Sequence, residues 1–148
     1  MNWAVDTNVL LRTTDLGNPA QPVAEGAIES LRLSGDSVSV FPQNLIEFWA
    51  VSTRPSVNNG LGLSIALAES QVNNLKAMFA LLDDTPQIFS AWERIVRQYR
   101  VTGKQAHDAR LVAAMEVHNV THLLTFNDRD FKRFTEITVV NPQHINCG

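Results

Sequence analysis

Short apolar segments that alternate with longer helical segments constrain the fold of this chain more than any other feature. The predicted strands cover residues 3–5, 37–41, 122–125 and 137–140. The predicted helices and helical turns cover residues 9–12, 22–33, 42–54, 64–82, 88–99, 104–118 and 128–134. Because strands that alternate with amphipathic helices typically form βαβ units, the pattern predicts an α/β layer fold with a mostly parallel sheet.

Apolar residues at helical spacing predict which faces of two helices are buried. For residues 42–54 the predicted apolar face comprises Leu45, Ile46, Trp49 and Ala50. For residues 64–82 it comprises Ile65, Leu67, Ala68, Val72, Leu75, Met78 and Phe79. Trp3, Trp49 and Trp92 are expected to anchor a core or a dimer interface.

Size and composition indicate a single globular domain, residues 1–148, with 45% hydrophobic and 18% charged residues. The net charge of −3 does not indicate nucleic-acid binding, which would need a local patch or metal ions. The single cysteine, Cys147, cannot form an internal disulfide. The chain contains neither a secretory signal nor an apolar stretch long enough for a bilayer, so we expect a cytoplasmic protein without membrane contact.

Acidic residues follow the predicted strands or begin the neighbouring helices. Asp6 follows the first strand, Asp108 lies near the start of helix 104–118, and Asp128 and Asp130 follow strand 122–125. Glu47 lies among large apolar residues and is expected to be at least partly sheltered. Each residue alone has a simpler explanation, such as a helix cap for Asp6 or an ordinary solvated charge for the others.

Together these acids favour a metal-dependent chemistry. The carboxyl ends of parallel strands meet at one sheet edge, where crowded carboxylates repel one another unless a divalent cation neutralises them. A ligand set made only of oxygens suits Mg²⁺ or Mn²⁺. Such ions activate water for phosphodiester displacement, so the expected class is a nuclease or a phosphatase.

Four segments resemble the motifs of PIN domains and occur in the order typical of that family. They are residues 5–12 (VDTNVLLR), 44–51 (NLIEFWAV), 107–114 (HDARLVAA) and 124–131 (LTFNDRDF). The chain looks most similar to VapC toxins of bacteria and archaea. The resemblance implies a PIN-like three-layer α/β/α fold and a Mg²⁺- or Mn²⁺-dependent endoribonuclease. It also implies a homodimer that a VapB-type antitoxin inhibits.

The resemblance also assigns roles to residues of this chain. The implied catalytic and metal-binding residues are Asp6, Glu47, Asp108 and Asp130. The fourth acidic position falls among Asn127, Asp128 and Asp130; the form Thr-Phe-Asn-x-x-Asp-Phe favours Asp130, with Asn127 able to bind through water. Side chains expected to hydrogen-bond around the ligands are Thr7, Asn8, Thr125 and Asn127. Basic residues that could contact RNA phosphates are Arg12, Arg54, Lys104 and Arg110.

Two alternatives remain open from the sequence. A phosphatase-type acidic-pocket hydrolase is one, although the Asp-x-Asp motif of haloacid-dehalogenase phosphatases would need an aspartate where this chain has Asn8. A PIN-fold RNA-binding module without turnover is the other. His107 is expected to have a structural or helix-terminal role, because adjacent residues of a helix point in different directions.

Overall fold

The structure is a computed structural model that describes residues 1–145; Cys147 and the end of the predicted domain lie outside the described residues. The strands are β1 (Asn2–Val5), β2 (Ser37–Val40), β3 (Ala80–Leu81), β4 (His122–Leu124) and β5 (Thr138–Val140). The helices are α1 (Thr7–Thr14), α2 (Gln21–Leu33), α3 (Pro42–Thr53), α4 (Ile65–Met78), α5 (Gln87–Gln98), α6 (Gln105–Val117) and α7 (Asp128–Phe131). Two 3₁₀ turns cover Ser56–Asn58 and Pro142–His144.

The described strands form one parallel sheet with the order β3-β2-β1-β4-β5. The first strand of the chain therefore lies at the centre, between β2 and β4. The strand order reverses direction between β1 and β4, where Val5 pairs with Leu124. In open parallel sheets, the crevice outside the carboxyl ends of the strands at such a reversal is the usual ligand site.

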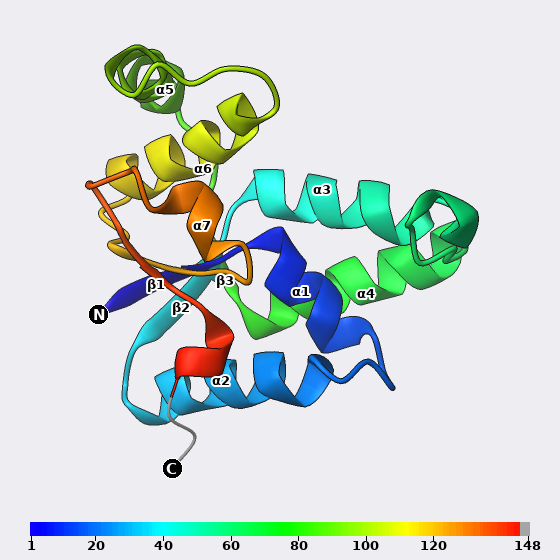
Figure 1. The fold of residues 1–148 in the computed structure, drawn as a ribbon. Helices are drawn as coiled ribbons and strands as arrows, with labels where there is room; N and C mark the ends of the chain where they lie inside the picture. Colours follow the sequence, from blue (N-terminus) through cyan, green and yellow to red (C-terminus); the bar gives the residue numbers. More distant parts are fainter. Residues whose placement is uncertain (146–148) are drawn as a thin grey trace.

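Alternating side chains of β1 point to opposite faces of the sheet and into two separate cores. Trp3 and Val5 belong to a core that α1, α2, α3 and α4 complete. Ala4 faces the other core, which α5, α6 and α7 complete. Figure 1 shows the resulting layers, with α5 and α6 above the strands and α2 below them. The predicted three-layer α/β/α fold with a short parallel sheet is confirmed.

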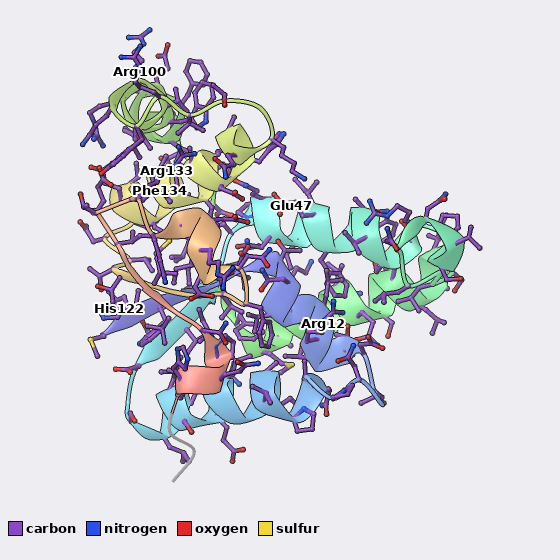
Figure 2. All side chains as sticks on the ribbon, viewed as in Figure 1. Arg12, Glu47, Arg100, His122, Arg133 and Phe134 are labelled. Carbon is purple, nitrogen blue, oxygen red and sulfur yellow. The ribbon has the colours of Figure 1, made fainter. Side chains whose placement is uncertain are left out.

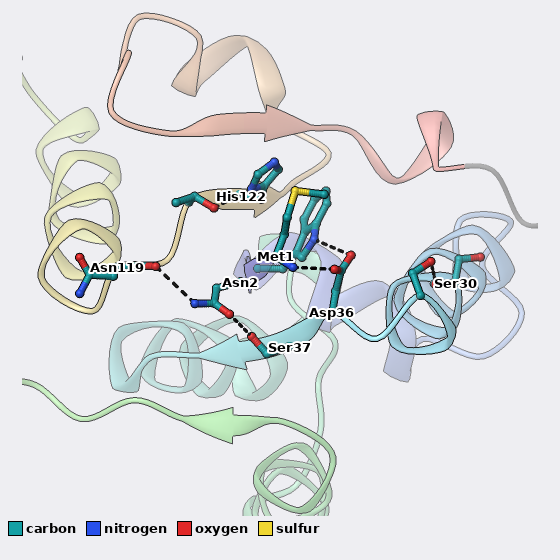
Figure 3. A network of polar contacts seen from close by, with 10 residues as sticks. Met1, Asn2, Ser30, Asp36, Ser37, Asn119 and His122 are labelled. Atoms are coloured by element: carbon teal, nitrogen blue, oxygen red, sulfur yellow. Dashed lines mark hydrogen bonds and ion pairs between the residues drawn. The ribbon is translucent and has the colours of Figure 1, made fainter.

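Polar contacts at the amino ends of the strands join β1 to its neighbours (Figure 3). Asn2 accepts a hydrogen bond from Ser37 Oγ at 2.7 Å and donates to the carbonyl of Asn119 at 3.5 Å. Trp3 Nε1 donates to Asp36 Oδ2 at 3.2 Å. These contacts fix the sheet at the end opposite to Asp6.

The predicted helix 64–82 is wrong beyond Met78. Phe79 has an extended backbone and a buried ring, and Ala80–Leu81 continue as edge strand β3, paired with Ser39 and Val40. Both β3 residues are exposed, so this strand lacks the apolar alternation that would distinguish it from the preceding helix. The helical turn predicted at 9–12 is also longer than expected, since α1 covers Thr7–Thr14.

The predicted apolar faces of two helices need correction. Ile46 is 68% exposed, whereas Phe48 is fully buried, because the buried stripe of α3 passes through Leu45, Phe48 and Ser52. Ala50 is also exposed. On α4, the exposed apolar side chains are Ile65, Leu67 and Met78. Helices α3 and α4 therefore carry apolar surface that residues 1–145 do not cover.

None of the helices within residues 1–145 combines the length and the hydropathy needed to cross a bilayer.

Candidate active site

Asp6 lies in the crevice between β1 and β4 and is almost completely buried. Its backbone N–H donates to the carbonyl of Leu124 at 3.0 Å, which continues the pairing of the two strands. Its carboxylate caps α1 by accepting from the backbone N–H of Thr7 at 2.8 Å. The other carboxylate oxygen accepts from Thr125 Oγ1 at 2.8 Å and from Asn8 Nδ2 at 3.3 Å.

Asn8 and Thr125 hold this aspartate by also bonding to each other. Asn8 Nδ2 lies 3.1 Å from Thr125 Oγ1, and Asn8 Oδ1 accepts from the backbone N–H of Phe126 at 3.0 Å. The Thr125 hydroxyl also accepts from the backbone N–H of Asn127 at 3.0 Å. The start of α1 is thereby fixed to the turn after β4. The Asn127 side chain itself is exposed.

Glu47 is partly buried, as predicted, and faces the start of α1 from helix α3. Thr7 Oγ1 donates to Glu47 Oε2 at 3.0 Å, and Gln43 Nε2 donates to Glu47 Oε1 at 3.0 Å. Gln43 Nε2 also donates to the carbonyl of His107 at 2.7 Å, which joins α3 to α6. Figure 2 shows Glu47 in the half of α3 that lies beside α6. Both carboxylate oxygens of Glu47 therefore have fixed partners.

The negative charges of the acidic residues perturb one another. Burial raises the pKa of Asp6 to about 6 against hydrogen bonds that lower it, and the charges of Glu47 and Asp108 raise it further. Burial also raises the pKa of Asp108 to about 6, with further increases from the charges of Asp130 and Glu47. The charge of Glu47 thus acts on both Asp6 and Asp108, and the charge of Asp130 acts on Asp108.

Asp128 and Asp130 differ in their surroundings although both lie in α7. Asp128 Oδ1 accepts a hydrogen bond from Asn141 Nδ2 at 3.2 Å, and this bond lowers the pKa of Asp128. Asp130 instead contributes the negative charge that acts on Asp108. The arrangement groups Asp130, not Asp128, with the other acids, and its catalytic role stays a prediction.

The donor chemistry of the cluster fits a hard divalent cation. Carboxylate oxygens are the ligands that Mg²⁺ and Mn²⁺ prefer. Burial is the main cause of the raised pKa values of Asp6 and Asp108, and a cation beside these carboxylates would favour their charged forms. Within residues 1–145, no three acidic, histidine or cysteine side chains are grouped closely enough to form a complete cation site. The ligand roles of individual residues therefore stay predictions.

The basic residues predicted to contact RNA have different surroundings. Arg12 lies 3.6 Å from Asp15 in an ion pair, and Arg110 pairs with Asp84 at 3.2 Å. The exposed residues Arg54 and Lys104 lie at the end of α3 and the start of α6.

Sequence reasoning missed two residues of the site. The positive charge of Arg133 lowers the pKa of Asp108, and its guanidinium donates to Gln105 Oε1. Gln43 connects Glu47, His107 and Arg110, whose Nη1 donates to Gln43 Oε1 at 3.0 Å. Arg133 lies in a charged turn, for which a solvated surface position is the simplest prediction. Gln43 is uncharged, so the pattern of charges in the sequence did not indicate it.

Both the sequence and the fold are similar to those of known proteins. The family model of the PIN domain matches residues 4–137. The fold resembles VapBC2 from Rickettsia felis bound to a promoter DNA fragment, with TM-score 0.72, 15% identity, and coverage of 95% of this chain and 98% of the matched chain. It also resembles FitAcB from Neisseria gonorrhoeae, with TM-score 0.69, 16% identity and coverage of 96% and 99%.

A third similar structure is VapC20 from Mycobacterium tuberculosis, described as a sarcin-ricin loop cleaving toxin. Its TM-score is 0.58 at 19% identity, with coverage of 82% of this chain and 86% of that chain. A search of curated proteins finds no significant match. At these identities the solved structures show a common fold, and the family match covers nearly the whole sequence. The chain belongs to the PIN domain family.

Proposed function

We propose that this protein is a metal-dependent endoribonuclease and the toxin of a VapBC-type toxin–antitoxin module. The observation that carries the proposal is the pair of sheltered carboxylates Asp6 and Asp108 at the sheet edge where the strand order reverses. The charge of Glu47 acts on both of them, and the charge of Asp130 acts on Asp108. Such a group is costly to maintain without a cation, and carboxylates with bound Mg²⁺ or Mn²⁺ are suited to phosphodiester hydrolysis.

In the proposed mechanism, Asp6 and Asp108 bind the cation and Glu47 and Asp130 complete the acidic pocket. Bound Mg²⁺ or Mn²⁺ lowers the pKa of a coordinated water and neutralises charge on the phosphate. The hydrogen bonds from Thr125, Asn8 and the Thr7 backbone hold the Asp6 carboxylate in one orientation.

Glu47 has a complementary role in this mechanism. The Thr7 hydroxyl and the Gln43 amide fix its two oxygens, so the carboxylate faces the Asp6 end of the crevice without needing to reorganise. A fixed carboxylate of this kind accepts a proton from water or orients it for in-line attack.

The partners of the module are also proposals. The similar structures include VapBC2 from R. felis and FitAcB from N. gonorrhoeae, and VapC20 is described as a sarcin-ricin loop cleaving toxin. These likenesses support an RNA substrate and a VapB-type antitoxin. The exposed apolar residues Ile46, Ile65 and Leu67 offer a surface for a protein partner. We further propose that residues 1–148 form one PIN domain that assembles as a homodimer.

The test is cleavage of a pool of structured RNAs by the purified protein with Mg²⁺ or Mn²⁺ and with EDTA. Wild-type protein is expected to cut only with metal, and Asp6→Asn and Asp108→Asn are expected to lose cutting. Asp128→Asn is the matched control, because Asp128 bonds to Asn141 and lies outside the acidic group.

Three other outcomes would reject the proposal. Cutting that survives both substitutions indicates a contaminant or a different site. Turnover of a generic phosphate monoester indicates a phosphatase. Folded protein that binds RNA and Mn²⁺ without cutting any RNA of the pool indicates a binding module.

A further inference from the structure

A cavity of about 400 Å³ lies between α5, the start of α6 and the segment before α5. Its wall is mostly apolar and includes Thr85, Ile88, Phe89, Trp92, His107 and Arg110. Figure 1 shows that α5 lies outside α6, as the outermost helix on this side of the sheet. A volume of this size suits a small planar ligand.

Two aromatic rings form a flat wall of the cavity. Phe89 is 63% exposed and stacks on Trp92, with ring centroids 5.5 Å apart and planes 27° from parallel. Trp92 Nε1 donates to the carbonyl of Ala106 at 2.8 Å, which fixes the indole on α6. Fixed and accessible aromatic faces bind nucleobases by stacking, irrespective of sequence.

The same wall carries positive charge. Arg110 lines the cavity and pairs with the exposed carboxylate of Asp84 at 3.2 Å. Positive charge here favours an anionic strand over an uncharged protein segment.

Hydrogen bonds of Gln43 link two residues that line the cavity to Glu47 of the acidic group. Gln43 bonds to Glu47 on one side and to the His107 carbonyl and Arg110 on the other, at 2.7–3.0 Å. His107 lines the cavity and directly precedes Asp108 in the sequence. A strand whose phosphate lies at the carboxylates can therefore place a neighbouring base in the cavity.

We propose that this cavity binds a nucleobase of the RNA strand beside the cleaved phosphodiester. The base stacks on the exposed face of Phe89, whose other face stacks on Trp92, and Arg110 faces the backbone. The inference rests on the proposed nuclease function and extends it to the recognition of unpaired RNA, because a base inside a duplex is not free to enter.

The test measures binding of a fluorescently labelled, short single-stranded RNA in EDTA, where metal-dependent cleavage is absent. Phe89→Ala is expected to weaken binding about 5- to 150-fold, the effect of losing one stacked base. Phe89→Tyr keeps the aromatic face and is expected to bind as the wild type does. Leu33→Ala, at an 81% exposed position on α2, is the matched control with unchanged binding.

The outcomes separate this inference from the nuclease proposal. Metal-dependent cutting by wild-type protein, with equal RNA binding by Phe89→Ala, overturns the base site alone. Phe89-dependent binding without any cutting supports the base site and rejects the nuclease. If Phe89→Ala dissociates a dimer, measured by light scattering, and leaves RNA binding unchanged, the face is an interface between two copies and the inference is overturned.

Discussion

Replacing Asp6 with asparagine is expected to change how the stability of the metal-free protein depends on pH. The pKa of Asp6 rises from an ordinary value of 3.8 to about 6 in the fold. Each pKa unit corresponds to about 1.4 kcal/mol, so ionised Asp6 costs the folded protein about 3 kcal/mol. Because the folded state binds the proton of Asp6 more tightly than the unfolded state does, protonated Asp6 stabilises the fold. This contribution to the free energy of unfolding is fully present below pH 3.8 and is lost as the pH rises through about 6.

The assay is urea unfolding in EDTA at a series of pH values from about 4 to about 7.5, followed by tryptophan fluorescence. Asparagine does not titrate, and its changed hydrogen bonds add an offset that is independent of pH. The free energy of unfolding of Asp6→Asn, minus that of wild type, should therefore grow by about 3 kcal/mol across this range.

A control of opposite sign is available in the same molecule. A hydrogen bond from Asn141 lowers the pKa of Asp128, so Asp128 contributes stability at neutral pH that is lost as the pH falls through its folded pKa. Because the folded pKa of Asp128 lies below the ordinary value of 3.8, Asp128→Asn should gain on wild type only at more acidic pH and should keep a nearly constant difference from wild type over the assayed range. A difference between Asp6→Asn and wild type that stays constant within about 1 kcal/mol would refute the assigned environment of Asp6.

Four further changes have defined expectations. Thr125→Val removes a donor to Asp6, so the pKa of Asp6 should rise further and RNA cleavage should fall about 10- to 150-fold; NMR titration and cleavage rates check both. Mn²⁺ at neutral pH should raise the Tm of wild type by about 5 °C or more and that of Asp6→Asn by less, in a thermal melt. Phe48→Ala empties a fully buried site and should cost about 3–5 kcal/mol in urea unfolding, whereas a cost below about 1 kcal/mol contradicts the assigned core. Gly60→Ala would place Cβ 2.0 Å from the carbonyl oxygen of Arg54, so its Tm should fall; an unchanged Tm contradicts this approach.

The parallel sheet and its layers were predictable because their signals are local. The buried strands β1 and β4 are short apolar runs, each followed by a polar residue, Asp6 or Thr125. Strand β3 was not predictable, because two exposed residues directly after an apolar helix satisfy the helical pattern equally well. Its identity depends on pairing with β2, which is separated from it by the whole of α3 and α4.

Side-chain direction was the other limit of the sequence. Ile46 and Phe48 are both large and apolar, and neighbours further along the chain decide that only Phe48 enters the core. The acidic residues of the site were easier to predict from the sequence than one of the residues that hold them in position. Asp6 was identified from its motif, but Gln43, which joins Glu47 to α6, carries no charge and no periodic signal.

The central position of the first strand has a consequence for synthesis on the ribosome. Asp6 emerges early, yet Thr125, which fixes its carboxylate, follows 119 residues later. At the usual translation rates of about 5–20 residues per second, this separation lasts roughly 6–24 seconds. During that interval the nascent chain has one open edge on β1 and no assembled acidic group. A site built in this way is assembled only near the end of the chain's own translation.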